Sequence, residues 1–167
     1  GGQKDLKNRL IRAVGEPDIR FQEDALRMMR AVRIATQLGF MIEEKTFESI
    51  AKNAKLINKI AGERIRDELF KILKSNSPAE GMLLLKNSGL LAEIMPEMLL
   101  GYGMKQRGHH IYDVWTHSLE ALKNCESKDE ITLLATFLHD SGKPQVMKTI
   151  NGVNTFFNHD IVGSRIA

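Results

Sequence analysis

Hydrophobic residues recur at helical spacing along most of the chain, and this pattern predicts an all-α protein. The clearest case is residues 21–38 (FQEDALRMMRAVRIATQL), where the apolar positions share one side and Gly39 is the predicted C-terminal cap. The same periodicity predicts further helices over residues 3–13, 44–53, 62–74, 111–124, 129–139 and 158–167.

Turn-forming residues divide these helices. Ser77 followed by Pro78 predicts the start of a helix that Gly89 can end, and Pro96 interrupts a helical pair over residues 90–100. Near the C-terminal end, Asn151-Gly152 lies between β-prone residues, so a small hairpin is predicted over residues 148–157.

Charge and cysteine content limit the environment and the partners. Residues 1–80 carry 16 Lys and Arg against 12 Asp and Glu, while residues 81–167 carry 8 against 9. The basic first part fits a polyanionic partner, although basic helices are more often simply solvated faces. The single cysteine, Cys125, excludes an intrachain disulfide and fits a reducing, cytoplasmic location. No apolar run has membrane-spanning length, and no signal peptide is recognisable, so we expect no membrane partner.

Four charged residues of the 21–38 segment form the first candidate site. Glu23, Arg27 and Arg30 lie four and three residues apart, so they share one helix face, and Asp24 flanks it. The simple alternative is an amphipathic helix with solvated charge pairs.

A fixed carboxylate beside a fixed guanidinium has a specific chemical use. Cytosine and adenine both place an exocyclic amine next to an unprotonated ring nitrogen. A carboxylate accepts a hydrogen bond from the amine, and a guanidinium donates one to the nitrogen. Uracil and guanine present a carbonyl and a ring N–H there, so both partners are mismatched. One Asp and one Arg could therefore select C and A without a nucleic-acid template.

Residues 15–40 (GEPDIRFQEDALRMMRAVRIATQLGF) resemble the neck of class II tRNA nucleotidyltransferases (CCA-adding enzymes) and bacterial poly(A) polymerases. Residues 1–15, 62–73 and 89–98 are similar to the family's flanking segments in the same order. The family's base-selecting EDxxR motif matches Glu23, Asp24 and Arg27. The resemblance implies that Asp24 and Arg27 select the base and that Glu23 holds Arg27, with Arg30 on the same face. By the same resemblance, the residues of the 62–73 segment that would pack against this helix and brace it are Glu63, Arg64, Arg66 and Glu68.

The resemblance also implies partners and a missing part. The expected partners are a tRNA or other RNA 3′ end, CTP and ATP. The family's polymerase chemistry needs an Asp-x-Asp pair that holds Mg²⁺ ions in the head domain, and none occurs in these 167 residues. We therefore expect the head to lie upstream of Gly1 and the fragment alone not to add nucleotides. A tag remnant is the alternative explanation of Gly1-Gly2.

Histidine and aspartate residues near the C-terminal end form the second candidate site. His117 is followed by His139-Asp140 and by His159, and ligands of these types on successive helices can converge on a divalent or transition metal. Isolated histidines that pack at helix ends are the alternative. The order H…HD…H, with Gly142-Lys143 after the HD, is similar to the HD superfamily. The resemblance implies His117, His139 and Asp140 as metal ligands and His159 as a substrate or second-metal contact. The superfamily's final Asp ligand is not supplied after Asp160, so we expect an incomplete site.

These similarities predict four parts, which are the end of a head or linker (1–15), a base-selecting neck (16–76), body helices (77–108) and a truncated HD-type domain (109–167). The leading hypothesis is a fragment of a template-independent nucleotidyltransferase that contributes base selection and RNA binding. A metal-dependent phosphohydrolase and a non-catalytic RNA-binding module remain the alternatives.

Overall fold

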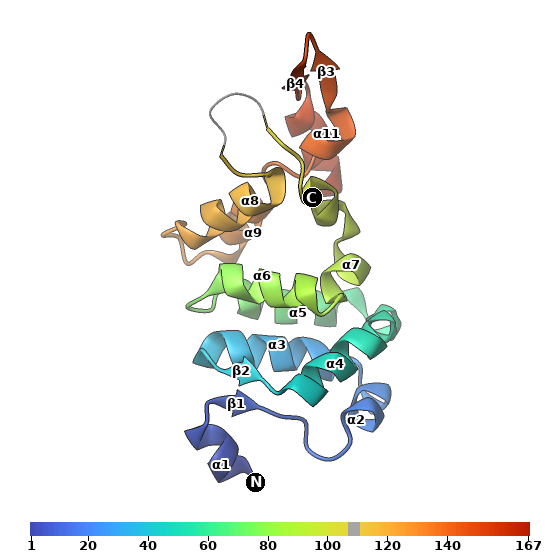
Figure 1. Ribbon diagram of the computed structural model, residues 1–167, viewed down its shortest axis with the longest axis vertical. Helices are drawn as coiled ribbons and strands as arrows, with labels where there is room; N and C mark the ends of the chain where they lie inside the picture. The colour runs from blue at the N-terminus through green and yellow to red at the C-terminus, as the bar shows by residue number, and fades with distance from the viewer. Residues whose placement is uncertain (107–110) are drawn as a thin grey trace. The chain divides into compact units, whose positions relative to one another are not determined.

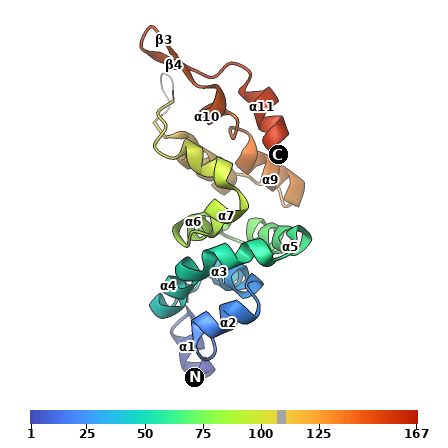
Figure 2. The same cartoon turned by 90° about the vertical axis from the view of Figure 1, so that its right-hand side faces the viewer.

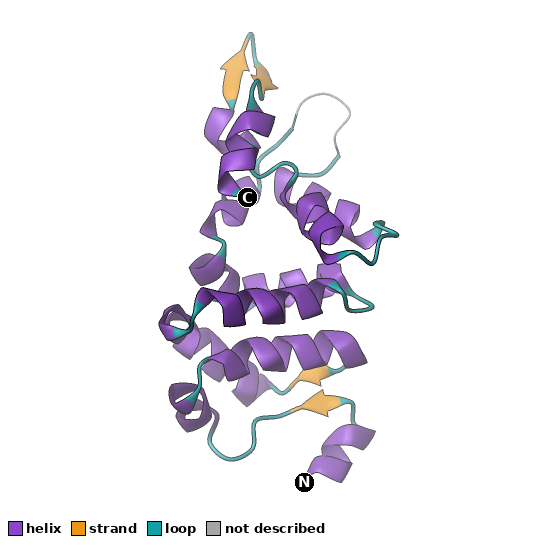
Figure 3. Ribbon diagram, turned by 180° about the vertical axis from the view of Figure 1, so that it is seen from behind, coloured by secondary structure: helices purple, strands orange, loops and turns teal. Residues whose placement is uncertain are grey.

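The structure is a computed structural model that describes residues 1–106 and 111–167. It consists of helices with a few strands of two or three residues, which confirms the all-α prediction (Figure 1, Figure 3). The chain forms two compact units, Gly1–Ile94 and Met95–Ala167. The predicted boundaries at 15/16 and 76/77 subdivide the first unit and stay predictions, and the predicted boundary at 108/109 lies outside the described residues.

The first unit opens with a short helix and a strand. Helix α1 (Gly2–Lys7) ends before Arg9, which has a positive φ of 52°. Strand β1 (Leu10–Ile11) then pairs in parallel with β2 (Met41–Ile42). The prediction of a continuous helix over residues 3–13 is therefore wrong, because Leu10 and Ile11 satisfy their backbone groups through a strand that is distant in sequence.

The predicted helix over residues 21–38 is divided in two. Helix α2 (Pro17–Glu23) ends where Asp24 adopts an extended conformation, and α3 (Leu26–Leu38) begins after it. The side chain of Asp24 accepts a hydrogen bond from the Leu26 amide at 3.1 Å, so an aspartate interrupts the helix and caps the next one. Gly39, with a φ of 64°, caps α3 as predicted.

Helix α3 lies at the centre of the first unit. It packs on α5 (Gly62–Leu73) and α6 (Pro78–Asn87), while α2 packs on α4 (Glu44–Asn53) (Figure 1, Figure 2). A 3₁₀ helix (Ala54–Lys59) and α7 (Leu90–Ile94) complete the unit. Gly81 allows α6 to approach α5 closely, since a Cβ at residue 81 would lie 2.4 Å from Cγ2 of Ile72 on α5. The fully buried apolar residues include Met28, Met29, Val32, Ile50, Ile72, Met82 and Leu85.

The second unit begins with a 3₁₀ helix (Pro96–Gly101), as the interruption at Pro96 predicts. Helices α8 (Val114–Lys123) and α9 (Glu130–Leu138) pack together, and Trp115 contacts Phe137 edge-to-face. The short α10 (Lys143–Val146) leads into the hairpin of β3 (Lys148–Ile150) and β4 (Val153–Thr155), and α11 (His159–Ile166) follows. The hairpin prediction is confirmed, because Asn151 and Gly152 both have positive φ.

Within the described ranges, none of the helices has the length and apolar character needed to cross a membrane.

Candidate nucleotide-selecting and metal-binding sites

Arg27 is held by a local network at the break between α2 and α3. Its Nη1 atom donates to Oε2 of Glu23 at 2.6 Å and to the carbonyl oxygen of Arg20 at 3.1 Å. Nη1 of Arg20 lies 3.2 and 3.1 Å from the two oxygens of Glu23. Hydrogen bonds from Arg27 and then from Arg20 lower the pKa of the Glu23 carboxyl, so Glu23 is an ionised anchor between two guanidinium groups.

Asp24 has different partners from Arg27. Its Oδ1 accepts from the Leu26 amide, and its Oδ2 lies 3.4 Å from Nη2 of Arg64 and 3.9 Å from Nη1 of Arg30. The helix break at Asp24 turns this carboxylate towards α5. Asp24 therefore contacts the Leu26 amide through Oδ1 and two arginines through Oδ2. It does not flank Arg27 on a continuous helix face, as the sequence predicted.

A cleft of about 320 Å³ lies beside this network. Arg20, Arg27 and Arg30 line it together with apolar side chains of Ile11, Val14, Phe21, Ala31 and Ile34. Arg27 lines the cleft, whereas Asp24 is not among the residues that line it. The cleft thus combines positive charge with an apolar wall, which suits a flat aromatic group that carries an anionic substituent.

Glu68 ties α5 to α3. Its side chain is 5% exposed, and its oxygens lie 2.6 Å from Nε of Arg33 and 3.1 Å from Nζ of Lys71. Nε of Arg30 lies 4.0 Å away. A buried carboxylate is stable only with such partners, so Glu68 fixes the face of α3 that carries Arg30 and Arg33.

The other three residues of the predicted brace differ from Glu68. Arg64 contacts Asp24, as described above. Among the described residues, Arg66 pairs with its neighbour Asp67, and both side chains are more than half exposed. Glu63 makes no hydrogen bond or ion pair within the same described ranges. The structure therefore joins Arg64 and Glu68 to residues 24–33 by ion pairs and shows no such contact for Arg66 or Glu63 in the part of the chain that it describes.

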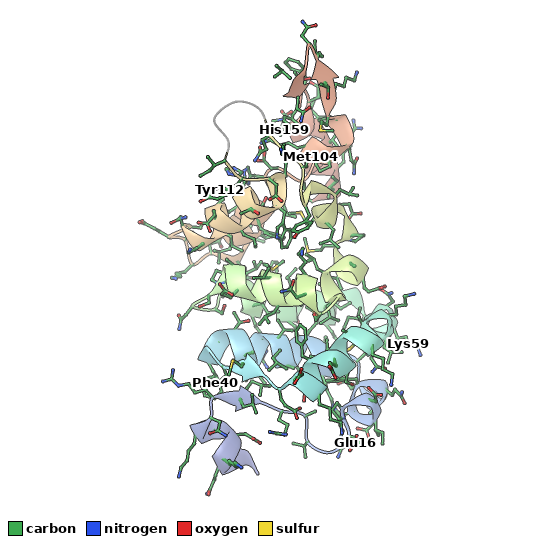
Figure 4. All side chains as sticks on the ribbon, in the orientation of Figure 1. Glu16, Phe40, Lys59, Met104, Tyr112 and His159 are labelled. Carbon is green, nitrogen blue, oxygen red and sulfur yellow. The ribbon has the colours of Figure 1, made fainter. Side chains whose placement is uncertain are left out.

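In the second unit, three imidazoles surround the buried carboxylate of Asp140. Oδ2 of Asp140 lies 3.2 Å from Nε2 of His139 and 3.6 Å from Nε2 of His117, and Oδ1 lies 3.8 Å from Nε2 of His159. Figure 4 labels His159. One ligand atom each of His117, His139 and Asp140 lie within 4.8 Å of one another. This donor set, two imidazole nitrogens and one carboxylate oxygen, fits a transition metal.

Backbone carbonyls orient two of these imidazoles. Nδ1 of His139 lies 2.8 Å from the carbonyl oxygen of Thr136, and Nδ1 of His159 lies 2.8 Å from that of Phe156. A carbonyl only accepts, so each Nδ1 is the donor. Metal-binding histidines are fixed in this way. Nε2 of a neutral ring then carries a lone pair that can bind a metal, whereas Nε2 of protonated His139 donates to Asp140, and this hydrogen bond raises the pKa of His139.

Lys143 and Gly142 shape the same cluster. Nζ of Lys143 donates to Oδ2 of Asp140 at 2.7 Å and to Oε1 of Gln106 at 2.6 Å. Burial raises the pKa of Asp140, but hydrogen bonds from His139 and Lys143 outweigh it and lower the pKa to about 2. A Cβ at Gly142 would lie 2.1 Å from the carbonyl oxygen of His159, so only glycine lets α11 approach and bring His159 to the site.

Comparison with known proteins gives a consistent set of relatives. Residues 39–100 match the family described as the probable RNA and SrmB-binding site of polymerase A. The A-adding tRNA nucleotidyltransferase of Deinococcus radiodurans is 38% identical over 99% of this chain and 40% of its own length. The CC-adding tRNA nucleotidyltransferase of Thermus thermophilus is 35% identical over 100% of this chain and 41% of its own length.

Solved structures agree with these relatives. The CCA-adding enzyme of Bacillus stearothermophilus in complex with CTP matches with a TM-score of 0.56 at 43% identity, over 57% of this chain and 24% of that chain. A tRNA-processing enzyme in its apo form I matches over 99% of this chain and 44% of its own, with a TM-score of 0.58 at 21% identity, which is a likeness of fold.

This chain belongs to the CCA-adding tRNA nucleotidyltransferase family. It spans 40% and 41% of the lengths of the two tRNA nucleotidyltransferases that it matches from end to end.

Two arginines that bind the predicted site residues were not predicted from the sequence. Arg20 binds Glu23, and Arg33 binds Glu68. A signal for Arg20 exists, because it lies three residues before Glu23 and could pair with it on one helix turn. Arg33 has no comparable signal, since its partner on α5 is 35 residues away.

Proposed function

We propose that this chain is the base-selecting and RNA-binding part of a template-independent tRNA nucleotidyltransferase. The complete enzyme would add CCA, or A alone, to RNA 3′ ends from CTP and ATP, in the cytoplasm. The observation that carries this proposal is Arg27, which is fixed by Glu23 and faces the apolar cleft beside Arg20 and Arg30.

The guanidinium of Arg27 is suited to this role because of how it is held. Among the described residues, both of its hydrogen bonds come from Nη1, which leaves Nε and Nη2 for a ligand. These groups can donate to the unprotonated ring nitrogen of cytosine or adenine. Uracil and guanine would place a ring N–H against them, and a buried mismatch of this kind discriminates strongly.

Asp24 would supply the complementary acceptor. Its Oδ2 is only loosely held, at 3.4 Å from Arg64 and 3.9 Å from Arg30. A small rotation would allow this oxygen to accept the exocyclic amine, while Oδ1 stays on the Leu26 amide.

Nucleotidyl transfer itself would take place in another part of the complete enzyme. Paired carboxylates that hold Mg²⁺ polarise the phosphoryl group in that chemistry, and we assign them to a head domain. The excess of basic residues in residues 1–80 and the match of residues 39–100 to an RNA-binding family support contact with the RNA by the first unit.

The test is an Arg27→Ala substitution in the full-length enzyme, with incorporation of all four nucleotides into a tRNA 3′ end as the readout. The kcat/KM for CTP and ATP should fall by about 100-fold or more relative to UTP and GTP. The matched control is Lys45→Gln, which breaks an exposed ion pair with Glu16 in the same unit. Unchanged selectivity in the Arg27 variant would exclude the base-selecting role.

The cluster around Asp140 favours a second function, metal-dependent phosphohydrolysis by an HD-type domain. His117, His139 and Asp140 would hold a divalent or transition metal, and His159 would contact the substrate. A bound metal lowers the pKa of its water and polarises a phosphoryl oxygen. The purified unmodified protein should then contain stoichiometric metal and hydrolyse a phosphodiester substrate. The His139→Ala variant should lose both the metal and the phosphodiesterase activity. Absence of both metal and turnover in the unmodified protein would exclude this function.

A further inference from the structure

Arg20 makes more polar contacts in the base-selecting network than Arg27 itself. Its Nε donates to the carbonyl oxygen of Val14 at 3.0 Å, and its Nη1 donates to both oxygens of Glu23. Its own carbonyl oxygen accepts from Nη1 of Arg27 at 3.1 Å. Arg20 therefore binds one of the two groups that hold Arg27, the Glu23 carboxylate, and supplies the other, and it joins both to the segment that precedes α2.

Glu23 needs a second partner to hold Arg27 in one orientation. The side chains of Glu23 and Arg27 are 43% and 39% exposed, and an isolated exposed ion pair samples many geometries. Nη1 of Arg20 donates to both Glu23 oxygens, and Oε2 also accepts from Arg27, so the carboxylate cannot rotate without breaking bonds. The orientation of Arg27 therefore depends on Arg20 as well as on Glu23.

The guanidinium of Arg20 is fixed on one side by a backbone atom, the carbonyl oxygen of Val14. The side chain of Val14 is 82% exposed, so packing does not hold this residue, whereas its carbonyl oxygen is bound by Arg20. The chain turns next at Gly15, which has a φ of 81°. A Cβ on Gly15 would lie 3.8 Å from Nε of Arg20, so the guanidinium lies against this turn.

These contacts need the planar fork of arginine. A guanidinium donates in two directions at once, to Val14 through Nε and to Glu23 through Nη1. The single ammonium of lysine keeps the charge but cannot span both acceptors with the same geometry. Arg20→Lys therefore separates the positioning effect from the charge.

We propose that Arg20 is a positioning residue for base selection, which fixes the guanidinium of Arg27 through Glu23 and through its own carbonyl oxygen. This inference rests on the proposed role of Arg27 and adds a specificity-determining residue to it. The EDxxR motif, which begins at Glu23, does not include Arg20.

The experiment compares Arg20→Lys, Arg20→Gln, Glu23→Gln and Arg27→Lys in the full-length enzyme. The readout is the ratio of kcat/KM for CTP to that for UTP. Active-enzyme concentration cancels from this ratio, so a merely structural loss leaves it unchanged. Arg20→Lys should lower the ratio about tenfold, because a misplaced guanidinium no longer opposes the ring N–H of uracil. Lys45→Gln should leave it unchanged.

A double substitution tests the coupling. If Arg20 acts through Glu23, then Arg20→Lys combined with Glu23→Gln should lower the ratio no further than the stronger single substitution. Two independent effects that multiply would overturn the proposed route.

The outcomes separate the two proposals. If Arg27→Lys leaves the ratio unchanged, the base-selecting function fails and the inference fails with it. If Arg27→Lys lowers the ratio while both Arg20 variants keep it, only the inference fails. The side chain of Arg20 is 45% exposed, so both variants should fold, and their thermal midpoints check this.

Discussion

The two candidate sites are built in opposite ways. The network of Arg20, Glu23 and Arg27, to which we assign base selection, lies within eight consecutive residues, and its side chains are 39–45% exposed. The cluster around Asp140 gathers side chains from α8, the C-terminal end of α9 and α11 around a carboxylate that is 4% exposed. The first is a local arrangement on the surface, and the second is a product of tertiary packing.

This difference decides what a substitution should do. In the exposed network, water replaces a lost partner, so stability changes little while the orientation of Arg27 changes. In the buried cluster, a lost partner leaves a charge without compensation, so stability and site geometry change together. The first site should therefore be separable from folding, and the second should not.

The largest effect is expected from Asp140→Ala. It leaves the ammonium of Lys143, whose side chain is 12% exposed, without its carboxylate. The second unit should lose about 3–5 kcal/mol of unfolding free energy. Urea unfolding followed by fluorescence measures this, because Trp115, the single tryptophan, is buried in the same unit. Glu23→Ala serves as the contrast and should leave the midpoint unchanged; an equal loss in both variants would remove the distinction between the sites.

Glu68→Ala tests whether the buried carboxylate between α3 and α5 contributes to the stability of the first unit. Removal of this carboxylate leaves Arg33 and Lys71 without their partner and should cost about 3 kcal/mol of unfolding free energy. Circular dichroism during urea unfolding measures the change. The adjacent Asp67→Ala, at an exposed position, should have no measurable effect. A stable Glu68 variant would show that apolar packing alone holds α5 on α3.

Gly81→Ala tests the packing of α6 without any change of charge. The new methyl group would lie 2.4 Å from Cγ2 of Ile72 and 3.1 Å from the side chain of Thr36, so the helices must separate. A loss of about 1–3 kcal/mol is expected from such overpacking. Gly62→Ala is the matched control, because a Cβ there meets nothing within 4 Å. Equal midpoints for both variants in thermal unfolding would contradict the close approach.

The smallest effect concerns Asp18, which ties α2 to α4. Hydrogen bonds from Lys52 and Ser49 lower the pKa of Asp18 to about 2. A carboxyl with a lowered folded-state pKa stabilises the fold above its unfolded-state value of about 4, and this contribution disappears as the pH falls towards 2. The thermal midpoints of the unmodified protein and Asp18→Asn should therefore differ at pH 6 and converge near pH 2. A constant difference across this range would show that the charge of Asp18 is irrelevant.

The sequence predicted much of this architecture because most elements follow local rules. The periodicity of α3, the cap at Gly39 and the Asn151-Gly152 turn all depend on neighbouring residues. One failure arose where a distant contact prevailed, because Leu10 and Ile11 pair with β2 instead of continuing a helix. The other is local, since Asp24 binds the Leu26 amide two residues further along and so interrupts the predicted helix.

The same contrast applies to the sites. The pairing of Glu23 with Arg27 follows from their spacing of four residues. The contact of Asp24 with Arg64 joins residues 40 positions apart, and the contact of Lys143 with Gln106 joins residues 37 apart. No spacing rule predicts such partners, because tertiary packing alone brings them together.

A crystal structure of the full-length enzyme with bound CTP tests most directly the proposed contact of Arg27 and Asp24 with the base. We expect Nη2 or Nε of Arg27 within about 3 Å of the cytosine ring nitrogen, and Oδ2 of Asp24 at a similar distance from the exocyclic amine. Glu23 should remain bound to Nη1 of Arg27. A cytosine bound elsewhere, with Arg27 and Asp24 still on their present protein partners, would contradict the proposed base selection.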